Sequence, residues 1–325
     1  MSMIPDTTGG DIEAGLASEA AEPIPLGRKI IQGRSPWQLA WQRLRHDRAA
    51  IISAAVIAAI IIMALMAPLI AAWIGHGPNQ QFIDIGENAN GGPVPPSGIF
   101  WLGTDSSGRD LFVRIVYGAR ISLSVGVLAT LLSIVMGVIF GLIAGYLGGF
   151  VDAVIARVID VMLAIPFLIL AISIATIWHP SFWLVILVVG VLSFTYPARI
   201  VRGQVISLKE KEYIQAARAL GAGPLRVMFV DLLPNVLAQV IVYGSLLIPA
   251  SIVAEASLSF LGVGIQPPTA DWGQMISDAS GYYQYGYWWY LLFPSVFLLI
   301  TTLAFNILGD SVRDALDPRG GGLYV

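Results

Sequence analysis

The sequence predicts an all-α protein that crosses a membrane six times. Only 12% of its 325 residues are charged, about half the share of a typical soluble domain, and the mean hydropathy is +0.76. Five stretches contain no Asp, Glu, Lys or Arg: 49–83, 121–151, 161–198, 232–254 and 279–309. Each can hold the roughly 20 apolar residues that a membrane crossing needs. Backbone groups in lipid must pair within their own segment, so these spans are expected to be helices.

The stretch 161–198 is too long for one helix. It is interrupted at Trp178-His179-Pro180-Ser181, where the proline cannot donate a backbone hydrogen bond. Dividing it there gives six expected spans, near 49–73, 120–146, 158–178, 182–203, 236–257 and 286–309.

The basic residues predict the orientation of these spans. With the N-terminus inside, the segments 1–48, 147–157, 199–235 and 310–325 hold fifteen of the eighteen Lys and Arg residues. Only Arg109, Arg114 and Arg120 fall outside. Cytoplasmic loops of membrane proteins carry this excess of positive charge, so both termini are expected to be cytoplasmic.

The segments flanking the spans have distinct compositions. Residues 1–34 are expected to form a disordered, acidic cytoplasmic tail without a cleavable signal peptide. Residues 35–48 predict an interfacial amphipathic helix, in which Trp37, Trp41 and Leu44 share one face. The expected extracytoplasmic segment is 74–119, the five-span core 120–309, and the cytoplasmic C-terminal tail 310–325. The chain has no cysteine, which excludes disulfides and thiolate metal sites.

The second expected span carries a small residue at every fourth position. These residues are Ala129, Ser133, Gly137, Gly141, Gly145 and Gly149. Small residues at this spacing allow a neighbouring helix to approach closely. We therefore expect a tight helix–helix seam, whose partner helix the sequence does not identify.

Two expected outer segments contain candidate residues for a gate or a docking face. In the first, Thr104 or Asp105 is a candidate helix cap and Asp110 with Arg114 an i,i+4 ion pair. The following residues Leu111, Phe112, Ile115 and Val116 are expected to rest on the membrane. The second segment, 258–285, reads either as a re-entrant or interfacial loop or as a docking face. The candidate residues are Asp105, Arg109, Asp110, Glu255, Asp271 and Trp272. Glu255 has a plainer reading, as a carboxylate that is solvated or hydrogen-bonded near the outer interface.

The loop between the fourth and fifth spans, 204–235, predicts a helical hairpin. Lys209 to Leu220 reads as a helix, Gly221-Ala222-Gly223-Pro224 as a break, and a second short helix runs to Pro234. Small residues along the first helix would let a partner's groove meet its backbone. The alternative is a basic hairpin lying on anionic lipid.

At this loop the chain resembles the membrane subunits of binding-protein-dependent ABC importers. Their pattern is Glu-Ala-Ala, three residues, Gly, nine residues, Ile, one residue and Leu-Pro. Gln215-Ala216-Ala217, Gly221 and Leu233-Pro234 stand at that spacing, with Gln215 in place of Glu and Asp231 in place of Ile. Residues 102–123, 255–276 and 309–319 are similar to the C-type permease of the dipeptide, oligopeptide and nickel branch. The resemblance covers roughly 36–319.

The resemblance implies a type I importer permease that forms half of a translocation pathway for di- or oligopeptides in a bacterial cytoplasmic (inner) membrane. It implies a B-type permease partner, two ATP-binding subunits that hold ATP and magnesium, an extracytoplasmic solute-binding protein and surrounding lipid, without nucleic acid. The expected ATPase-coupling residues are Tyr213, Gln215, Ala216, Ala217, Gly221, Leu233 and Pro234.

Three other functions remain open at this point. The same architecture would also suit nickel complexes or another small solute. A self-contained secondary transporter predicts inverted repeats and buried ionisable residues at the membrane midplane, which the sequence does not clearly show. An enzyme is not expected, because the chain lacks a phosphate-binding loop and its three histidines, His46, His76 and His179, are scattered. No cofactor or metal is therefore expected in this chain.

Overall fold

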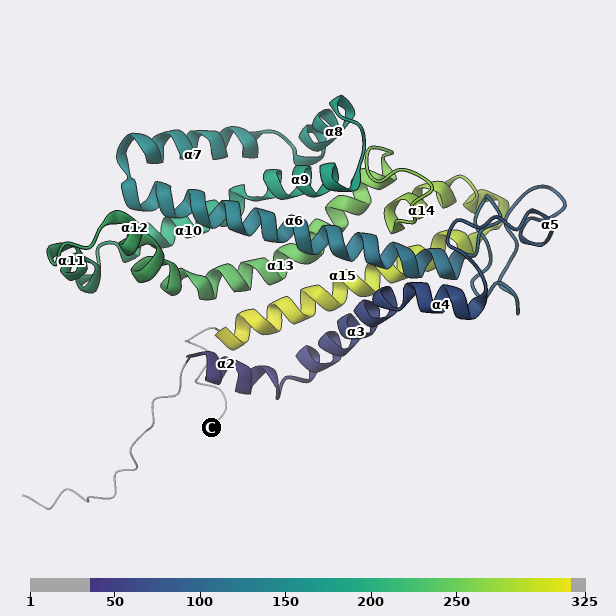
Figure 1. Cartoon of the computed structure of the whole chain (residues 1–325), viewed down its shortest axis with the longest axis horizontal. Helices are drawn as coiled ribbons and strands as arrows, with labels where there is room; N and C mark the ends of the chain where they lie inside the picture. The colour runs from purple at the N-terminus through teal and green to yellow at the C-terminus, as the bar shows by residue number, and fades with distance from the viewer. Residues whose placement is uncertain (1–35, 317–325) are drawn as a thin grey trace, which may run out of the picture. The chain divides into compact units, whose positions relative to one another are not determined.

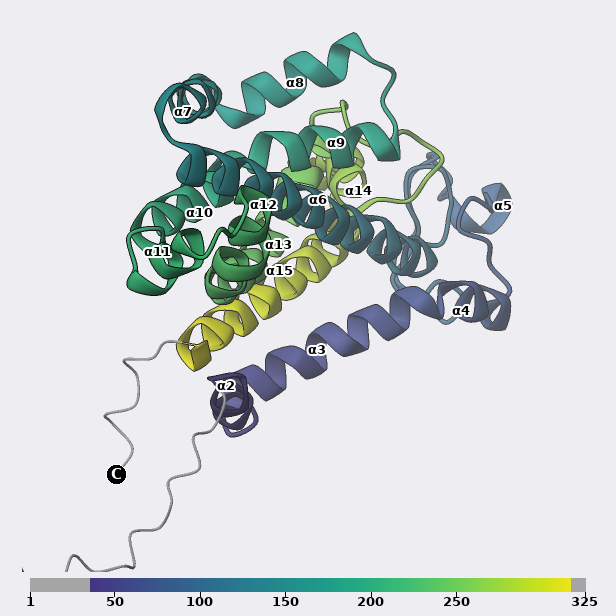
Figure 2. The same ribbon diagram turned by 60° about the vertical axis from the view of Figure 1, so that its left-hand side comes forward.

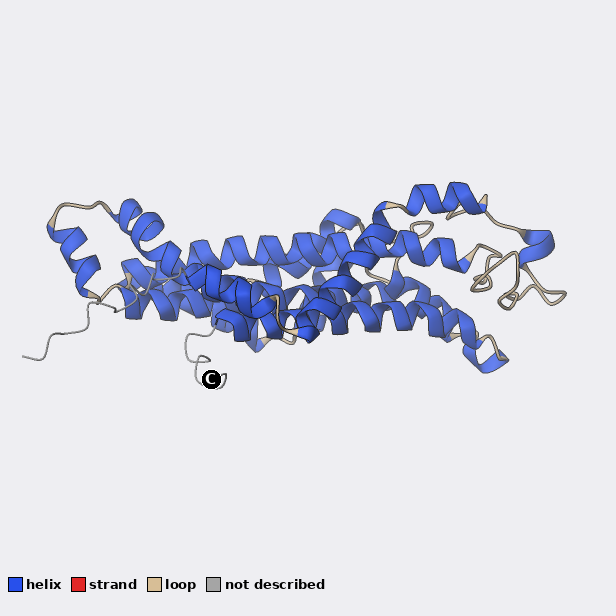
Figure 3. Cartoon of the chain, turned by 90° about the horizontal axis from the view of Figure 1, so that it is seen from below, coloured by secondary structure: helices blue, strands red, loops and turns tan. Residues whose placement is uncertain are grey.

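The computed structural model describes residues 36–316, which form a bundle of long helices with no β-strand (Figures 1 and 3). The predictions for residues 1–34 and for residues 317–325 of the C-terminal tail lie outside this range. The helices are α2 (Pro36–Leu44), α3 (Arg48–Leu65), α4 (Ala67–Ile74), α5 (Ile83–Gly86), α6 (Leu111–Leu147), α7 (Gly149–Ala164), α8 (Phe167–Ile177), α9 (Phe182–Ser193), α10 (Thr195–Leu208), α11 (Glu212–Ala219), α12 (Pro224–Arg226), α13 (Leu233–Phe260), α14 (Trp272–Ser280) and α15 (Trp288–Leu316).

Five continuous helical segments within residues 36–316 are long and apolar enough to cross a membrane. They are Arg48–Leu65, Leu111–Leu147, Phe182–Leu208, Pro224–Phe260 and Trp288–Leu316. The pair α7 and α8 adds a sixth candidate span, although its two helices meet at an angle of 93°. The predicted all-α, multi-spanning architecture is therefore confirmed.

The third expected span, 158–178, is not one continuous helix but is broken between α7 and α8. Ile165 has extended backbone angles, φ −94° and ψ 129°, and Pro166 follows it. A proline disfavours helical geometry in the residue before it, which explains the break between α7 and α8 at this point.

Three other boundaries differ from the prediction. The first span is divided at Met66, between α3 and α4, because Pro68 stands near the start of α4. The second span starts at Leu111, where Asp110 caps α6 by accepting a hydrogen bond from the Val113 backbone N–H at 3.1 Å. Neither Thr104 nor Asp105 is the cap.

The last helix also runs further than expected. α15 continues to Leu316, so residues 310–316, which were expected to belong to the tail, are helical.

A seam of glycines joins α6 to α10. A Cβ atom placed on Gly137, Gly141 or Gly145 would lie 2.7 Å from a side-chain carbon of Pro197, Val201 or Val205, respectively. Real Cβ atoms do not approach other heavy atoms this closely, so only glycine fits at these positions. Both helices repeat the contact every four residues, as expected for close packing of small residues.

The other members of the small-residue series take different positions. Ser133 is fully buried, and the Ala129 carbonyl oxygen lies 3.0 Å from a Cβ placed on Gly190 of α9. Gly149 is not part of the seam. It lies beyond the end of α6, at φ +54°, with no atom within 4 Å of its Cβ position.

α6 runs along the length of the helical bundle, with α7 beside it and α10, α13 and α15 packed near it (Figures 1 and 2). The hairpin α11–α12 lies at one end of these helices, together with α2 and the end of α15 (Figure 1). α4, α5 and α14 lie toward the opposite end. We call these the hairpin end and the α14 end.

We predict that Gly141→Leu destabilises the protein by about 1–3 kcal/mol, because its side chain would overlap Val201 and the Ala198 carbonyl in a packed seam. Thermal unfolding in lipid nanodiscs measures the effect. Gly203→Leu is the matched control, because Gly203 lies on α10 with open space at its Cβ position. Equal stability of the two variants would contradict the packing role of the seam.

Candidate functional site

The hairpin, residues 209–234, is anchored by a buried side chain of its own. Ile214 of α11 is completely buried. It belongs to a hydrophobic cluster with Leu142 of α6, Val205 of α10, and Val227 and Leu232 of the chain that returns from the hairpin. Because burial of an isoleucine contributes about 1.5–3 kcal/mol, the hairpin is a packed part of the structure rather than a solvated linker.

The turn of the hairpin is closed by backbone hydrogen bonds. The N–H groups of Gly221 and Ala222 donate to the carbonyls of Arg218 and Ala217 at 2.9 and 3.0 Å. Gly221 has φ +87°, a left-handed conformation that glycine adopts at the ends of helices without steric cost. Pro224 then starts α12.

The second half of the hairpin differs from the prediction. It does not end as a short helix at Pro234. α12 leads through a π-helical turn, Val227–Leu232, directly into α13. Leu233 and Pro234 therefore form the first turn of α13, where a proline without an N–H group is tolerated.

The structure separates the predicted coupling residues into two places. Tyr213, Gln215 and Ala216 are exposed on α11, and Ala217 is half-buried. Gly221 is exposed in the turn, whereas Leu233 and Pro234 lie in the helix that follows.

The tip of the hairpin is apolar and exposed. Leu220 is 89% exposed and Leu225 is 69% exposed, on either side of the turn. The backbone between them includes Gly221 and Gly223, both open to solvent. Large apolar side chains displayed together on a projecting loop indicate a surface that another protein covers.

Two contacts connect the hairpin to α6. The Lys209 ammonium donates to the Gly145 carbonyl at 3.1 Å, close to the end of α6. The Arg218 guanidinium lies over the Tyr146 ring, 4.8 Å from its centre, at a distance typical of cation–π interactions. A displacement of the hairpin therefore acts directly on the helix that runs the length of the bundle.

Near the α14 end, charged side chains are buried in an ion-pair network. Asp105 is 1% exposed and pairs with Arg109 at 2.6 Å and with Arg114 at 3.1 Å. The Arg114 guanidinium is also almost fully buried and donates to the Pro78 carbonyl at 3.1 Å. Removing one member of such a network leaves a buried charge without its partner, which is strongly destabilising.

The predicted Asp110–Arg114 pair is wrong. Arg114 is turned toward Asp105, whereas Asp110 is 2.6 Å from the Nδ1 atom of His76. Asp110 does not pair with Arg114 because it is the N-cap of α6. Its carboxylate therefore faces the backbone N–H groups at the start of that helix.

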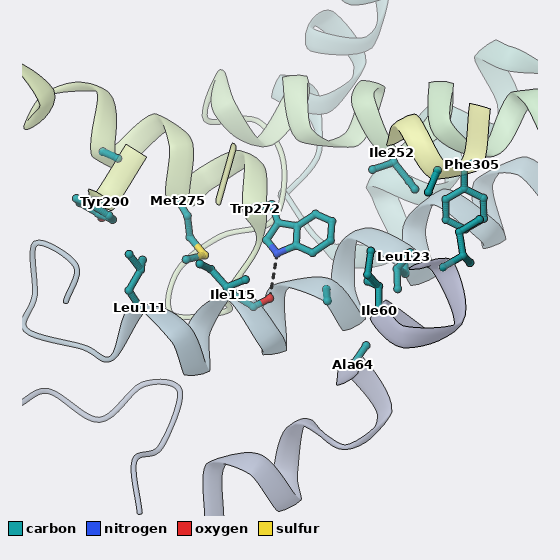
Figure 4. Close-up of a cluster of buried hydrophobic side chains, with 14 of the residues drawn as sticks. Ile60, Ala64, Leu111, Ile115, Leu123, Ile252, Trp272, Met275, Tyr290 and Phe305 are labelled. Carbon is teal, nitrogen blue, oxygen red and sulfur yellow. Dashed lines mark hydrogen bonds between the residues drawn. The ribbon is translucent and has the colours of Figure 1, made fainter. Parts of the chain in front are cut away.

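The residues after Asp110 do not rest on the membrane as predicted. Leu111, Ile115 and Val116 are completely buried in protein. Leu111 and Ile115 contribute to a core that includes Trp272 of α14 (Figure 4). The reason is that α14 folds back over the start of α6 and covers this surface.

α14 packs against both α6 and α13. The Trp272 indole is buried and donates to the Ile115 carbonyl at 2.9 Å (Figure 4). A Cβ placed on Gly118 of α6 would lie 2.9 Å from this indole, and one on Gly273 would lie 2.3 Å from the Ala256 carbonyl of α13. α14 thus contacts α6 through the Trp272 indole and α13 through the backbone at Gly273.

Beside Trp272, two carboxyl groups meet inside the protein. Glu255 of α13 and Asp271 are each completely buried, and their side chains interact. Ser259 donates to Glu255 at 3.2 Å, and the Gly273 N–H donates to Asp271 at 3.0 Å. Of the two plainer readings of Glu255, the hydrogen-bonded one is confirmed by the contact with Ser259, and the solvated one is wrong because the carboxyl group is buried. Burial raises the pKa of Asp271, which lies outside the spans.

The structure thus brings the six candidate gate or docking residues into two groups. Asp105 and Arg109 lie in the ion-pair network, followed by Asp110 in its pair with His76. Glu255 lies beside Asp271 and Trp272 at the start of α14. Two partners of these residues, His76 and Ser259, were not predicted. Nothing in the sequence indicates that His76 meets Asp110 or that Ser259 bonds to Glu255. Within residues 36–316, no group of three or more His, Asp or Glu side chains has an arrangement that could hold a metal ion.

Comparisons with known families identify two matching regions. Residues 137–320 match the family described as binding-protein-dependent transport system inner membrane component. Residues 35–93 match the N-terminal TM domain of oligopeptide transport permease C.

Several curated proteins are similar along most of their length. The chain is 40% identical over 282 residues to the dipeptide transport system permease protein DppC of Bacillus subtilis, covering 87% of this chain and 85% of the relative. It is 40% identical over 289 residues to the oligopeptide transport system permease protein OppC of Escherichia coli K12, covering 89% and 93%. It is also 40% identical over 288 residues to the glutathione transport system permease protein GsiD of Salmonella paratyphi A, covering 89% and 92%.

A solved structure shares the fold. The MetNI methionine ABC transporter in an inward-facing conformation contains a chain that matches 63% of this chain and 96% of its own length, with a TM-score of 0.51 and 20% identity. This likeness shows the fold alone.

We predict that Asp271→Asn reduces the dependence of stability on pH. Because burial raises its pKa, Asp271 favours the folded state when protonated. Stability is therefore lost as pH rises from the ordinary aspartate value of about 3.9 through the raised value. An asparagine retains the helix cap but does not titrate. Unfolding temperatures in nanodiscs at about pH 4 and about pH 8 should differ less for the variant than for the wild type.

Asp84→Asn is the control, because Asp84 is exposed on α5. A pH dependence that is the same in the Asp271→Asn variant and in the wild type would exclude Asp271 as the responsible group.

Proposed function

The chain belongs to the family of binding-protein-dependent transport system inner membrane components, and we propose that it imports di- or oligopeptides as one of two permease subunits of an ABC importer. The proposed assembly contains a B-type permease, two ATP-binding subunits and an extracytoplasmic solute-binding protein. The peptide assignment is supported by the relatives named for dipeptide and oligopeptide transport. The relative named for glutathione, a peptide-like molecule, fits the same chemical class.

The proposed location is the bacterial cytoplasmic membrane, with the hairpin end inside the cell. Fifteen of the eighteen Lys and Arg residues then fall on the cytoplasmic side, in agreement with the positive-inside rule. The ion-pair network and α14 then belong to the outer face, where the solute-binding protein would deliver the peptide.

The observation that carries the proposal is the hairpin. It presents an exposed apolar tip, Leu220 and Leu225, and an exposed face of small residues around Ala216. A groove on an ATP-binding subunit can accept this surface, and ATP and magnesium would be bound by that subunit. Because Lys209 and Arg218 contact the end of α6, closure of the ATP-binding subunits would move α6 largely as a rigid body.

We predict that a cysteine at Ala216 forms a crosslink to an ATP-binding subunit in the intact complex. The chain has no cysteine of its own, so an Ala216→Cys variant carries a single reactive thiol on the exposed face of α11. Mass spectrometry of the crosslinked complex identifies the partner.

Ser97→Cys is the control, on an exposed position in the segment between α5 and α6. It should react with a membrane-impermeant reagent applied outside the cell and form no crosslink to the ATP-binding subunit. Labelling of position 216 from outside the cell would show that the hairpin is extracytoplasmic, which would contradict the proposal.

We predict that Gly221→Val uncouples ATP hydrolysis from peptide uptake. Valine is strained at φ +87°, so the turn that presents the tip would change its conformation. Gly223→Val is the matched control, because Gly223 is equally open but has φ −70°, which valine adopts without strain.

The measurement is ATP-driven uptake of a labelled dipeptide into proteoliposomes, together with ATPase activity. The Gly221→Val variant should hydrolyse ATP but take up less peptide than the wild type. The Gly223→Val variant should retain more peptide uptake than the Gly221→Val variant. Normal uptake by the Gly221 variant would exclude the turn from coupling.

A further inference from the structure

A groove at the hairpin end has no part in the proposed transport mechanism. It has a volume of about 1080 Å³ and is open to the surface. Its walls are the elbow between α2 and α3 on one side and the last turns of α15 on the other. This volume is comparable to that of ligand pockets, about 300–1,000 Å³.

Polar contacts fix the two walls of the groove. The Ser311 hydroxyl donates to the Asp47 carboxylate at 2.6 Å, and the Arg43 guanidinium donates to the Ala315 carbonyl at 3.3 Å. Asp47 also caps α3 by accepting from the Ala49 N–H at 2.9 Å. The hydrogen bond from Ser311 lowers the pKa of Asp47, as expected for a bond that stabilises the charged carboxylate.

The lining contains three arginines, Arg43, Arg45 and Arg48, and two acidic residues, Asp47 and Asp314. Arg45 and Arg48 are exposed and pair with no acidic residue in the part of the chain that the structure describes.

The location of Arg48 is unfavourable without an anion. It is the first residue of α3, where the helix dipole already produces a positive potential that repels cations. The Asp47 carboxylate, which accepts from Ala49 and Ser311, offsets part of this potential. A bound anion in contact with Arg45 and Arg48 would offset more of it.

The groove lies at the depth of lipid headgroups. α3 becomes apolar immediately after Arg48, and Ile51 and Ile52 are 51% and 64% exposed on its surface. Trp41 of α2, 69% exposed, has the amphipathic ring that favours the membrane–water interface. A ligand in the groove would therefore have its charged part among arginines and its apolar part along exposed isoleucines.

We propose that this groove binds the phosphodiester headgroup of an anionic phospholipid, with Arg45 and Arg48 as its ligands. Phosphatidylglycerol fits because its headgroup is a single anionic phosphodiester, which arginine side chains bind with charge-assisted hydrogen bonds. Basic pockets beside transmembrane helices are a general means of holding such headgroups. The bound lipid fills the space between the α2–α3 elbow and α15, and so stabilises the contact between the first and last spans.

The test compares unfolding temperatures of the full-length protein in its complex, in phosphatidylcholine nanodiscs with and without phosphatidylglycerol. We expect phosphatidylglycerol to raise the unfolding temperature of the wild type and to remain bound in native mass spectrometry. Both effects should be lost in the Arg45→Gln/Arg48→Gln double variant. Because both side chains are exposed, the variant should fold, and its unfolding temperature in pure phosphatidylcholine checks this.

Arg157→Gln is the matched control. Arg157 is an exposed arginine on α7, outside the groove, and its replacement should leave both lipid effects intact. An equal loss with Arg157→Gln would show a general effect of surface charge and overturn the proposal. Equal stabilisation by inorganic phosphate in pure phosphatidylcholine would assign the groove to a free anion, which also overturns it.

A third outcome concerns the acidic segment at the N-terminus. Removal of residues 1–27 should leave the phosphatidylglycerol effect in place. If this truncation alone lowers the unfolding temperature in pure phosphatidylcholine, and added phosphatidylglycerol has no effect on the wild type, the carboxylates of that segment occupy the groove instead of lipid.

Discussion

The close approach of α6 and α10 is the contact on which the rest of the structure depends. Gly137, Gly141 and Gly145 leave no room for a Cβ atom against α10, so the two backbones meet almost directly. In lipid, where apolar side chains gain little by leaving their surroundings, such packing is a principal source of helix association. The seam fixes α10, and α10 leads directly into the hairpin.

The continuous helix α6, held in this seam, connects the two ends of the bundle. At the hairpin end, Lys209 and Arg218 contact the last residues of α6. At the α14 end, the same helix carries Gly118 and Ile115, against which the Trp272 indole packs. A continuous helix transmits displacement better than a series of loops, which suits a subunit that couples ATP hydrolysis on one side to solute delivery on the other.

Charge is placed according to the same architecture. Asp105 and Arg114 are buried but paired, because an isolated charge inside the protein would be too costly. Glu255 and Asp271 share a buried site without a basic partner near them in the described part of the chain. At the hairpin end Arg45 and Arg48 remain exposed, and the lipid headgroup that we propose as their ligand would neutralise them.

The sequence by itself determined the helical, membrane-spanning architecture, the expected orientation and the hairpin, because hydropathy, basic residues and glycine–proline breaks act locally along the chain. It did not determine the burial of Glu255 or the partners of Asp110 and Arg114. Those features depend on α14 folding back over α6 and on side chains up to about 150 residues apart, such as Trp272 and Ile115. Local patterns contain no information on such contacts, so only the tertiary structure decides them.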